Sequence, residues 1–152
     1  MALITLSRPN AANGLNLTMT SELASVATFC DCNDDIRAVI LTGEGKFFSA
    51  GGDIKAMASF GDDVSIKIKL LADDLYAALS TFARMSAPVI VAVNGMAAGA
   101  GFSLAISGDI VLAVPRAKFV MAYTRAGLSP DGGLLMSCHS RSDCVVPRNL
   151  CC

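Results

Sequence analysis

The sequence predicts one α/β domain, because short apolar strands alternate with amphipathic helices and two strand-to-helix connections are rich in glycine. A length of 152 residues is typical of a single domain. The net charge of -1, without a run of basic residues, disfavours binding to nucleic acid or to an anionic membrane surface. The composition therefore favours small-molecule chemistry.

The first expected elements are a strand and a helix. Residues 2–7 ("ALITLS") predict a strand that ends before Pro9, because proline cannot continue a hydrogen-bonded ladder. Thr18 is the expected N-cap of the next helix, with Glu22 in its first turn. We expect one face of this helix to lie in the core, because its apolar residues recur at helical spacing: Met19, Leu23, Val26, Ala27 and Cys30.

The middle of the chain predicts a strand, a loop and a long helix. Residues 37–43 ("RAVILTG") indicate a buried strand, and residues 43–53 ("GEGKFFSAGGD") a glycine-rich loop that brings the backbone close to another group. The longest helix is expected over residues 63–85. Its apolar positions recur every three or four residues: Val64, Ile68, Leu71, Leu75, Leu79 and Phe82.

Residues 85–108 carry no charge and are long enough to raise the alternative of a membrane span. Pro88, Asn94 and four glycines interrupt the segment, and "VIVAV" is a β-branched run. These features favour a buried strand, a turn and a helix over a membrane span. Two further short strands are expected at 109–113 and 117–122.

The cysteines divide into two groups. Cys30 and Cys32 lie in a helical stretch without a secretory signal ahead of them, which favours a reducing, cytoplasmic location. The other cysteines and the only histidine lie near the end of the chain: Cys138, His139, Cys144, Cys151 and Cys152. Their spacing fits none of the paired-ligand zinc patterns, so we predict no metal site; stoichiometric zinc in the purified protein would revive that alternative.

Glycine-rich turns that lead into a helix leave backbone N–H groups free for an anion or a developing oxyanion. Three common uses fit poorly here. A dinucleotide-binding turn needs a third glycine where Leu104 stands, a serine hydrolase elbow would need glycine at Ala105, and the phosphate-loop motif is absent.

Three segments in order resemble the motifs of the crotonase, or enoyl-CoA hydratase/isomerase, superfamily. They are "FFSAGGDIKAM" (47–57), "APVIVAVNGMAAGAGFSLAISGDIVLA" (87–113) and "AKFVMAYTRAGLSPDGG" (117–133), and "ITLSRPNAANGLN" (4–16) resembles the opening strand and turn. The resemblance covers residues 2 to about 136. It implies the N-terminal core of a ββα spiral, without the C-terminal helical part, and an acyl-CoA thioester as substrate.

The resemblance also assigns site residues. It places the two backbone N–H groups that bind the thioester oxygen at Gly52 and Ala100. Such preorganised donors can stabilise an enolate by about 3–4 kcal/mol each. Gly52, Asp53, Ile54 and Lys55 match the stretch that also holds the adenine end of CoA. For the Asp53 side chain, the alternative role of capping the following helix is favoured.

The resemblance favours an isomerase over a hydratase. Family hydratases use two glutamates, and their positions fall on Ser103 and Tyr123, which are not carboxylates. Asp131 stands where isomerases and dehalogenases carry their aspartate, although "SPDGG" is also a good turn sequence. The motifs look most like the branch that isomerises ring-epoxidised phenylacetyl-CoA and related enoyl-CoAs. Ser103 is expected either to line the acyl pocket or only to pack.

The family pattern stops abruptly near residue 136. We therefore expect a crotonase-like core over 1–136 and a non-family tail over 137–152. In one possible back-translation, restoring a single G after the Met136 codon makes the tail read "MVLPLALGLRRAAELVL", which looks like the missing family helix. A one-base deletion in the gene or its sequencing is the expected explanation, and resequencing through codon 136 tests it.

The resemblance implies no cofactor, because coenzyme A is part of the substrate. Full-length relatives form trimers or dimers of trimers, whereas this chain would lack the helices that close the acyl pocket. Two alternatives to the isomerase stay open: an enoyl-CoA hydratase, and an inactive fragment that at most binds CoA. A truncated core is also expected to expose apolar surface.

Overall fold

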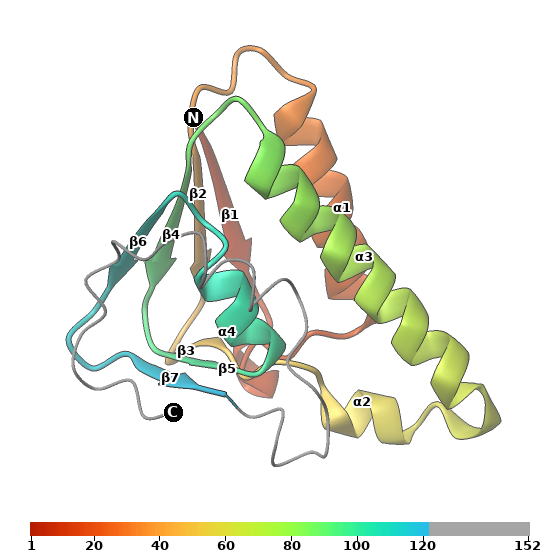
Figure 1. Ribbon diagram of the computed structural model, residues 1–152. Helices are drawn as coiled ribbons and strands as arrows, with labels where there is room; N and C mark the ends of the chain where they lie inside the picture. Colours follow the sequence, from red (N-terminus) through yellow and green to blue (C-terminus); the bar gives the residue numbers. More distant parts are fainter. Residues whose placement is uncertain (122–152) are drawn as a thin grey trace.

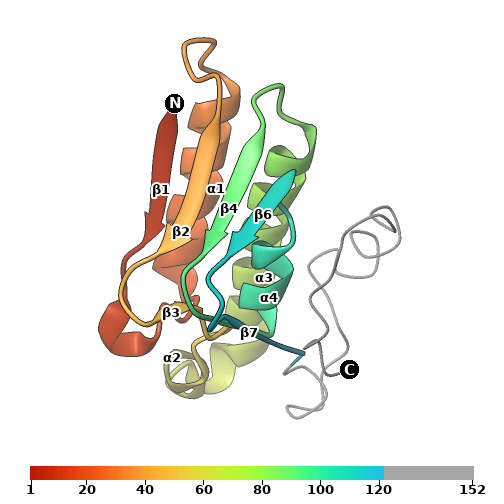
Figure 2. The same cartoon turned by 90° about the vertical axis from the view of Figure 1, so that its left-hand side faces the viewer.

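The computed structural model describes residues 1–121. These residues form two sheets of parallel strands, with helices on one side (Figures 1 and 2). The four-stranded sheet has the order β1-β2-β4-β6, and the three-stranded sheet has the order β3-β5-β7. Their bounds are β1 Ala2–Leu6, β2 Val39–Gly43, β3 Phe47–Ser49, β4 Val89–Val93, β5 Met96–Ala98, β6 Ile110–Ala113 and β7 Lys118–Val120. The predicted α/β class is confirmed.

After β1, the chain runs as a spiral, and each turn of the spiral adds one strand to each of the two sheets. β2 leads to β3, β4 to β5 and β6 to β7, and each new pair lies parallel to the pair before it. The register is continuous across the larger sheet, with Val39 opposite Val89 and Ile90 opposite Ile110. This arrangement is the ββα spiral that the resemblance implies.

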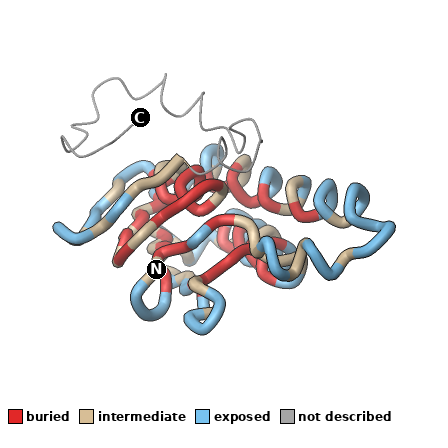
Figure 3. Tube along the Cα trace, turned by 90° about the horizontal axis from the view of Figure 1, so that it is seen from below, coloured by how far each residue is buried: buried red, intermediate tan, exposed pale blue. Residues whose placement is uncertain are grey.

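Two long helices, α1 (Leu17–Asp31) and α3 (Val64–Arg84), lie side by side and cover one face of the larger sheet (Figure 2). The core forms where these helices meet the strands. Its fully buried members include Phe48, Phe82, Leu15, Leu41, Leu104, Val39, Val89 and Val91. Figure 3 shows buried and exposed residues alternating along the long helices, as expected when one helix face packs on a sheet.

The start of α1 corrects the sequence prediction. The N-cap is Asn16, whose side-chain oxygen accepts from Met19 N–H at 3.0 Å, and Thr18 lies inside the helix. Glu22 is consequently not in the first turn. The helix begins early because Leu15 ends an extended segment that is paired with residues 51–53. Val26 is 38% exposed and not in the core, whereas the other expected face residues are buried: Met19, Leu23, Ala27 and Cys30.

The predicted core face of α3 is correct only for its C-terminal part. Leu71, Leu75, Leu79 and Phe82 are buried, whereas Val64 and Ile68 are 37% and 41% exposed. The first turns of α3 extend past the ends of the strands, so no sheet lies beneath them (Figure 1). Helical periodicity predicts which face of α3 is apolar, but it does not predict how much of that face the sheet covers.

Both glycine-rich connections contain short strands that were not predicted. β3 lies within the expected loop 43–53, with Phe48 fully buried, and β5 follows β4 within 85–108. The segment 85–108 therefore forms strand, strand and helix, the last being α4 (Ala100–Ala105). In the part of the chain that the structure describes, no helix is both long and apolar enough to cross a membrane.

Among residues 1–121, β6 is an edge strand of the larger sheet, and it leaves apolar side chains in solvent. Ile110 is 50% exposed and Leu112 is 59% exposed. The β6 bounds agree with the expected strand over 109–113, and those of β7 with the expected strand over 117–122 as far as residue 121. The expectation that apolar surface is exposed is met at this edge.

Candidate oxyanion site

The turn after β3 is held from one side by residues 12–15. Ala50 N–H donates to Ala12 O at 3.0 Å, Leu15 N–H donates to Gly51 O at 2.8 Å, and Asp53 N–H donates to Leu15 O at 2.9 Å. These bonds join segments far apart in the sequence. They fix the backbone of the turn on the side that faces residues 12–15.

The same bonds determine the direction of the Gly52 amide. Leu15 and Gly52 form an isolated parallel bridge in which Leu15 bonds to the two neighbours of Gly52. In parallel pairing, the residue opposite such a pair directs its own N–H and C=O to the other side. Within residues 1–121 the Gly52 N–H has no hydrogen-bond partner. The sequence-based candidate is therefore a free donor that points away from residues 12–15.

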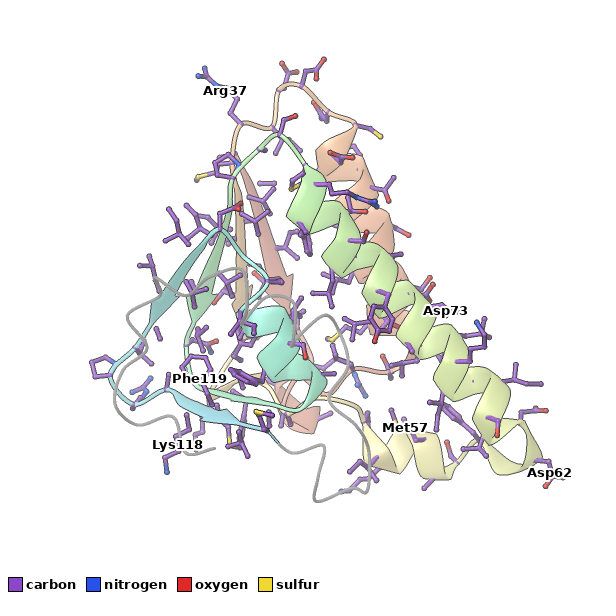
Figure 4. All side chains as sticks on the ribbon, viewed as in Figure 1. Arg37, Met57, Asp62, Asp73, Lys118 and Phe119 are labelled. Carbon is purple, nitrogen blue, oxygen red and sulfur yellow. The ribbon has the colours of Figure 1, made fainter. Side chains whose placement is uncertain are left out.

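The second candidate donor lies in the turn between β5 and α4. Gly99 has φ 52° and ψ -126°, and its N–H donates to Val120 O of β7 at 3.0 Å. Gly99 O accepts from Phe102 N–H at 2.9 Å, which starts α4. The Ala100 N–H has no partner in the described part of the chain, as expected for the first residue of a helix. Phe119 of β7 points toward α4, where its ring packs edge-on against Phe102 at a centroid distance of 5.7 Å (Figure 4).

The two turns lie against each other through Gly51. Gly51 has φ +89°, and a β-carbon there would lie 2.6 Å from Ala98 O and 3.3 Å from Ala100 N. Only glycine permits this conformation and this approach together. The structure thus brings the peptides around Gly52 and Ala100 into one neighbourhood, although 48 positions separate them in the sequence.

Asp53 caps α2 (Ile54–Ala58) and pairs with Arg8. Its Oδ1 accepts from Ala56 N–H at 3.0 Å, and its Oδ2 accepts from Arg8 Nη2 at 2.9 Å. Arg8 also donates to Gly14 O. The hydrogen bond from Ala56 N–H, together with Arg8, lowers the pKa of Asp53, against the opposing effect of burial. The expectation that Asp53 is a cap is confirmed, and its role toward CoA stays a prediction.

The residues after Asp53 form the outer wall of the turn. Ile54 is 72% exposed and Lys55 is exposed beside it. Met57 of α2, labelled in Figure 4, reaches back over Gly52, because a β-carbon on Gly52 would lie 2.6 Å from the Met57 methyl carbon. A flexible thioether therefore covers one side of the candidate donor.

Three predicted site residues remain, and the structure describes only one of them. Ser103 is buried, with 1% exposure, on α4. Tyr123 and Asp131 lie outside the described residues, as do the tail cysteines and His139. Sequence reasoning missed Arg8, Asn13 and Ser49 as supports of the turn. The only signal for them was the spacing of polar residues within otherwise apolar motifs, which does not identify their partners.

A groove of about 360 Å³ lies between β1 and α1, away from the two candidate donors. Its lining includes Leu6, Met19, Leu23 and Glu22, but neither Gly52 nor Ala100. We place the candidate site at the two turns because each presents an N–H group without a partner in the described part of the chain, whereas the groove is lined by a strand edge and a helix flank. Among residues 1–121, no group of three or more His, Cys, Asp or Glu side chains is placed to hold a metal ion.

Comparisons with known proteins agree on one family. The model of the enoyl-CoA hydratase/isomerase family matches residues 1–141. A 1,2-epoxyphenylacetyl-CoA isomerase of Escherichia coli is 40% identical over 134 residues, covering 86% of this chain and 50% of that protein. A solved enoyl-CoA hydratase from a Polaromonas species matches with a TM-score of 0.82 at 36% identity, covering 96% of this chain and 55% of the other. One from Bacillus anthracis matches with a TM-score of 0.78 at 30% identity, covering 86% and 50%. The chain spans about half the length of the relatives it matches.

Proposed function

The chain belongs to the enoyl-CoA hydratase/isomerase family, and from this premise we propose that it binds an acyl-CoA thioester and stabilises the thioester enolate. The observation that supports the proposal is the pair of N–H groups at Gly52 and Ala100 that have no partner among residues 1–121, in turns that touch through Gly51. Donors fixed before the reaction act on charge as it develops on the oxygen, and each contributes about 3–4 kcal/mol.

The charges around the first turn suit an anionic intermediate. Asp53 directly follows Gly52, and an unpaired carboxylate there would oppose an enolate. Its two oxygens are instead bound by Ala56 N–H and by Arg8. The carboxylate is neutralised by an ion pair, so the Gly52 amide can bind an oxyanion without strong repulsion from its neighbour.

The proposed reaction is a double-bond shift, with Asp131 as the proton carrier. The Asp131 carboxylate removes a proton from carbon 2 or carbon 4 of an enoyl-CoA, and the electron pair moves onto the thioester oxygen between the two N–H groups. The enolate then collapses as the same carboxyl group returns the proton to the other carbon. One carboxylate is sufficient for this sequence, and Ser103 and Tyr123 supply none.

Ultraviolet absorbance tests the reaction class. A 3-enoyl-CoA offered to the purified protein should become a 2-enoyl-CoA, whose double bond is conjugated with the thioester, so absorbance rises. We expect Asp131→Asn to lower this rate by about 10²- to 10⁴-fold, the usual contribution of a general acid–base group. Asp34→Asn, at an exposed carboxylate in the loop before β2, is the matched control and should retain the wild-type rate. Equal rates in the two variants would refute the role of Asp131.

A hydratase is the second candidate, and the observation that favours it is the match to solved enoyl-CoA hydratases. A 2-enoyl-CoA distinguishes the two reactions. Addition of water removes the conjugated double bond and lowers the absorbance, whereas an isomerase leaves a 2-enoyl-CoA largely unchanged. Rapid loss of absorbance would contradict the proposal that Ser103 and Tyr123 leave the site without hydration chemistry.

The third candidate is a protein that binds CoA without turnover, which the absence of carboxylates at Ser103 and Tyr123 favours. A monodisperse sample that binds an acyl-CoA but converts neither substrate would support it. The enolate-binding part of the proposal would then stand, and the catalytic part would fall.

A further inference from the structure

Ser49 lies at the end of β3, between the two candidate donor turns, and is fully buried. Its hydroxyl donates to Asn13 O at 2.8 Å and accepts from Gly51 N–H at 3.2 Å. The single hydroxyl therefore joins the turn of residues 49–53 to the segment around Asn13. It also draws the Gly51 amide inward, which leaves the next amide, that of Gly52, as the one available to a ligand.

The same residue touches the second turn. A β-carbon on Gly101 would lie 2.5 Å from Ser49 O and 2.7 Å from Ser49 Oγ, so the first turn of α4 packs directly on Ser49. Gly101 is the neighbour of Ala100, whose amide is the second candidate donor. A change in the Ser49 side chain therefore alters the contacts of both donor turns.

The acceptor of the Ser49 hydroxyl is itself fixed. Asn13 is fully buried at φ 52°, a conformation that asparagine adopts more readily than most residues. Its Nδ2 donates to Glu44 O at 2.9 Å and to Phe47 O at 2.8 Å, and its Oδ1 accepts from Arg8 N–H at 2.9 Å. Both polar atoms of the Asn13 side chain are therefore hydrogen-bonded. They hold in place the residue whose carbonyl accepts from the Ser49 hydroxyl.

We propose that Ser49 is a positioning residue that sets the direction of the Gly52 N–H and its spacing from the Ala100 N–H, an inference that rests on the proposed function. Ser49 is fully buried, so its proposed role is to position the donors and not to bind substrate. It acts through the peptides on its two sides, and its hydroxyl has a specific task that a buried methyl group cannot perform. Loss of the hydroxyl leaves the Gly51 N–H without its partner, and the turn can rotate to find another.

The test compares Ser49→Ala with Thr20→Val. Thr20 is also fully buried, and its hydroxyl bonds at the start of its own helix, to the carbonyls of the N-cap Asn16 and of Leu17, each at 3.1 Å. Two ligands are used, butyryl-CoA and its thioether S-butyl-CoA, which lacks the carbonyl oxygen. The ratio of the two affinities reports the oxyanion donors and is insensitive to loss of general stability.

We expect Ser49→Ala to lower the preference for thioester over thioether by about tenfold, while thioether affinity stays within about twofold. Thr20→Val should keep the wild-type ratio. A folded Ser49→Ala protein with the wild-type ratio overturns the inference alone. A wild-type ratio near one overturns the proposed function and this inference with it.

Amide hydrogen exchange tests the inference without any variant, should Ser49→Ala fail to fold. In the wild-type protein without ligand, the Gly51 amide should be protected by the buried hydroxyl, and the Gly52 amide should exchange at least about tenfold faster. Equal exchange of the two amides overturns the proposed orientation, whatever the ligand data show.

Discussion

Replacing Gly51 by alanine should destabilise the protein more than the same change at Gly61. Both glycines have positive φ, +89° and +59°, so each alanine suffers backbone strain, and the strain is larger at Gly51 because its φ lies outside the left-handed helical region. Around Gly61 a β-carbon would meet nothing within 4 Å, whereas at Gly51 it would lie 2.6 Å from Ala98 O. The comparison with Gly61 therefore shows how much the close packing at Gly51 costs beyond the strain of a positive φ in an open site.

The expected magnitudes follow from these contacts. A left-handed conformation costs alanine about 1–2 kcal/mol, and the restricted unfolded chain returns about 0.4–1 kcal/mol. Gly61→Ala should thus lower the free energy of unfolding by at most about 1.6 kcal/mol. At Gly51, the overlap with backbone atoms adds about 1–3 kcal/mol, because neither turn can move without breaking its hydrogen bonds.

Urea unfolding followed by far-ultraviolet circular dichroism measures the difference. With a slope of about 2 kcal/mol per molar urea, a 2 kcal/mol difference separates the two midpoints by about 1 M. Wild-type protein sets the reference slope, which should be unchanged in both variants. Midpoints for Gly51→Ala and Gly61→Ala within about 0.2 M of each other would falsify the direct contact between the turns.

Three further outcomes are expected. The pKa of Asp53 lies below its usual value of 3.8 in the folded protein, so its contribution is present above about pH 4 and is lost as the pH falls through the folded pKa. Asp53→Asn should lower the free energy of unfolding at pH 7 by about 1–3 kcal/mol. Below about pH 4, the free energy of unfolding of the variant should fall less steeply with pH than that of the wild type, and parallel curves for the two proteins would contradict this. Cys32 should be alkylated at least about tenfold faster than Cys30 in peptide mass spectra, because Cys30 is buried and burial raises its pKa; equal rates would contradict the packing of α1. Asn16→Ala should lower the unfolding free energy by about 1 kcal/mol, and an unchanged denaturation midpoint would show that the cap is not formed.

The sequence predicted the elements that have a strong period. The β-branched run of β4 and the C-terminal part of the apolar face of α3 both lie where the spacing of apolar residues places them. Three-residue strands show no period, so the sequence of β3 and β5 indicates only glycine-rich loops. The exposed start of α3 depends on where the strands end, which local sequence does not encode.

The candidate site was predictable only in part. Gly52 and Ala100 came from a resemblance of motifs, and the structure supports them as free donors within residues 1–121. The buried supports of the turn, Asn13 and Ser49, bond across 36 positions of the chain. A serine or asparagine within a motif can serve a turn, a cap or a distant partner, and only the folded chain selects among these.

One measurement tests the central claim most directly: amide resonances of Gly52 and Ala100 in ¹⁵N-labelled protein, titrated with butyryl-CoA and with S-butyl-CoA. Both ligands carry the same CoA and alkyl groups, and only the first has the carbonyl oxygen. Both amides should move downfield with the thioester and not with the thioether, because a new hydrogen bond deshields the proton. Shifts that are equal for the two ligands, or absent from both amides, would contradict an oxyanion site at these turns.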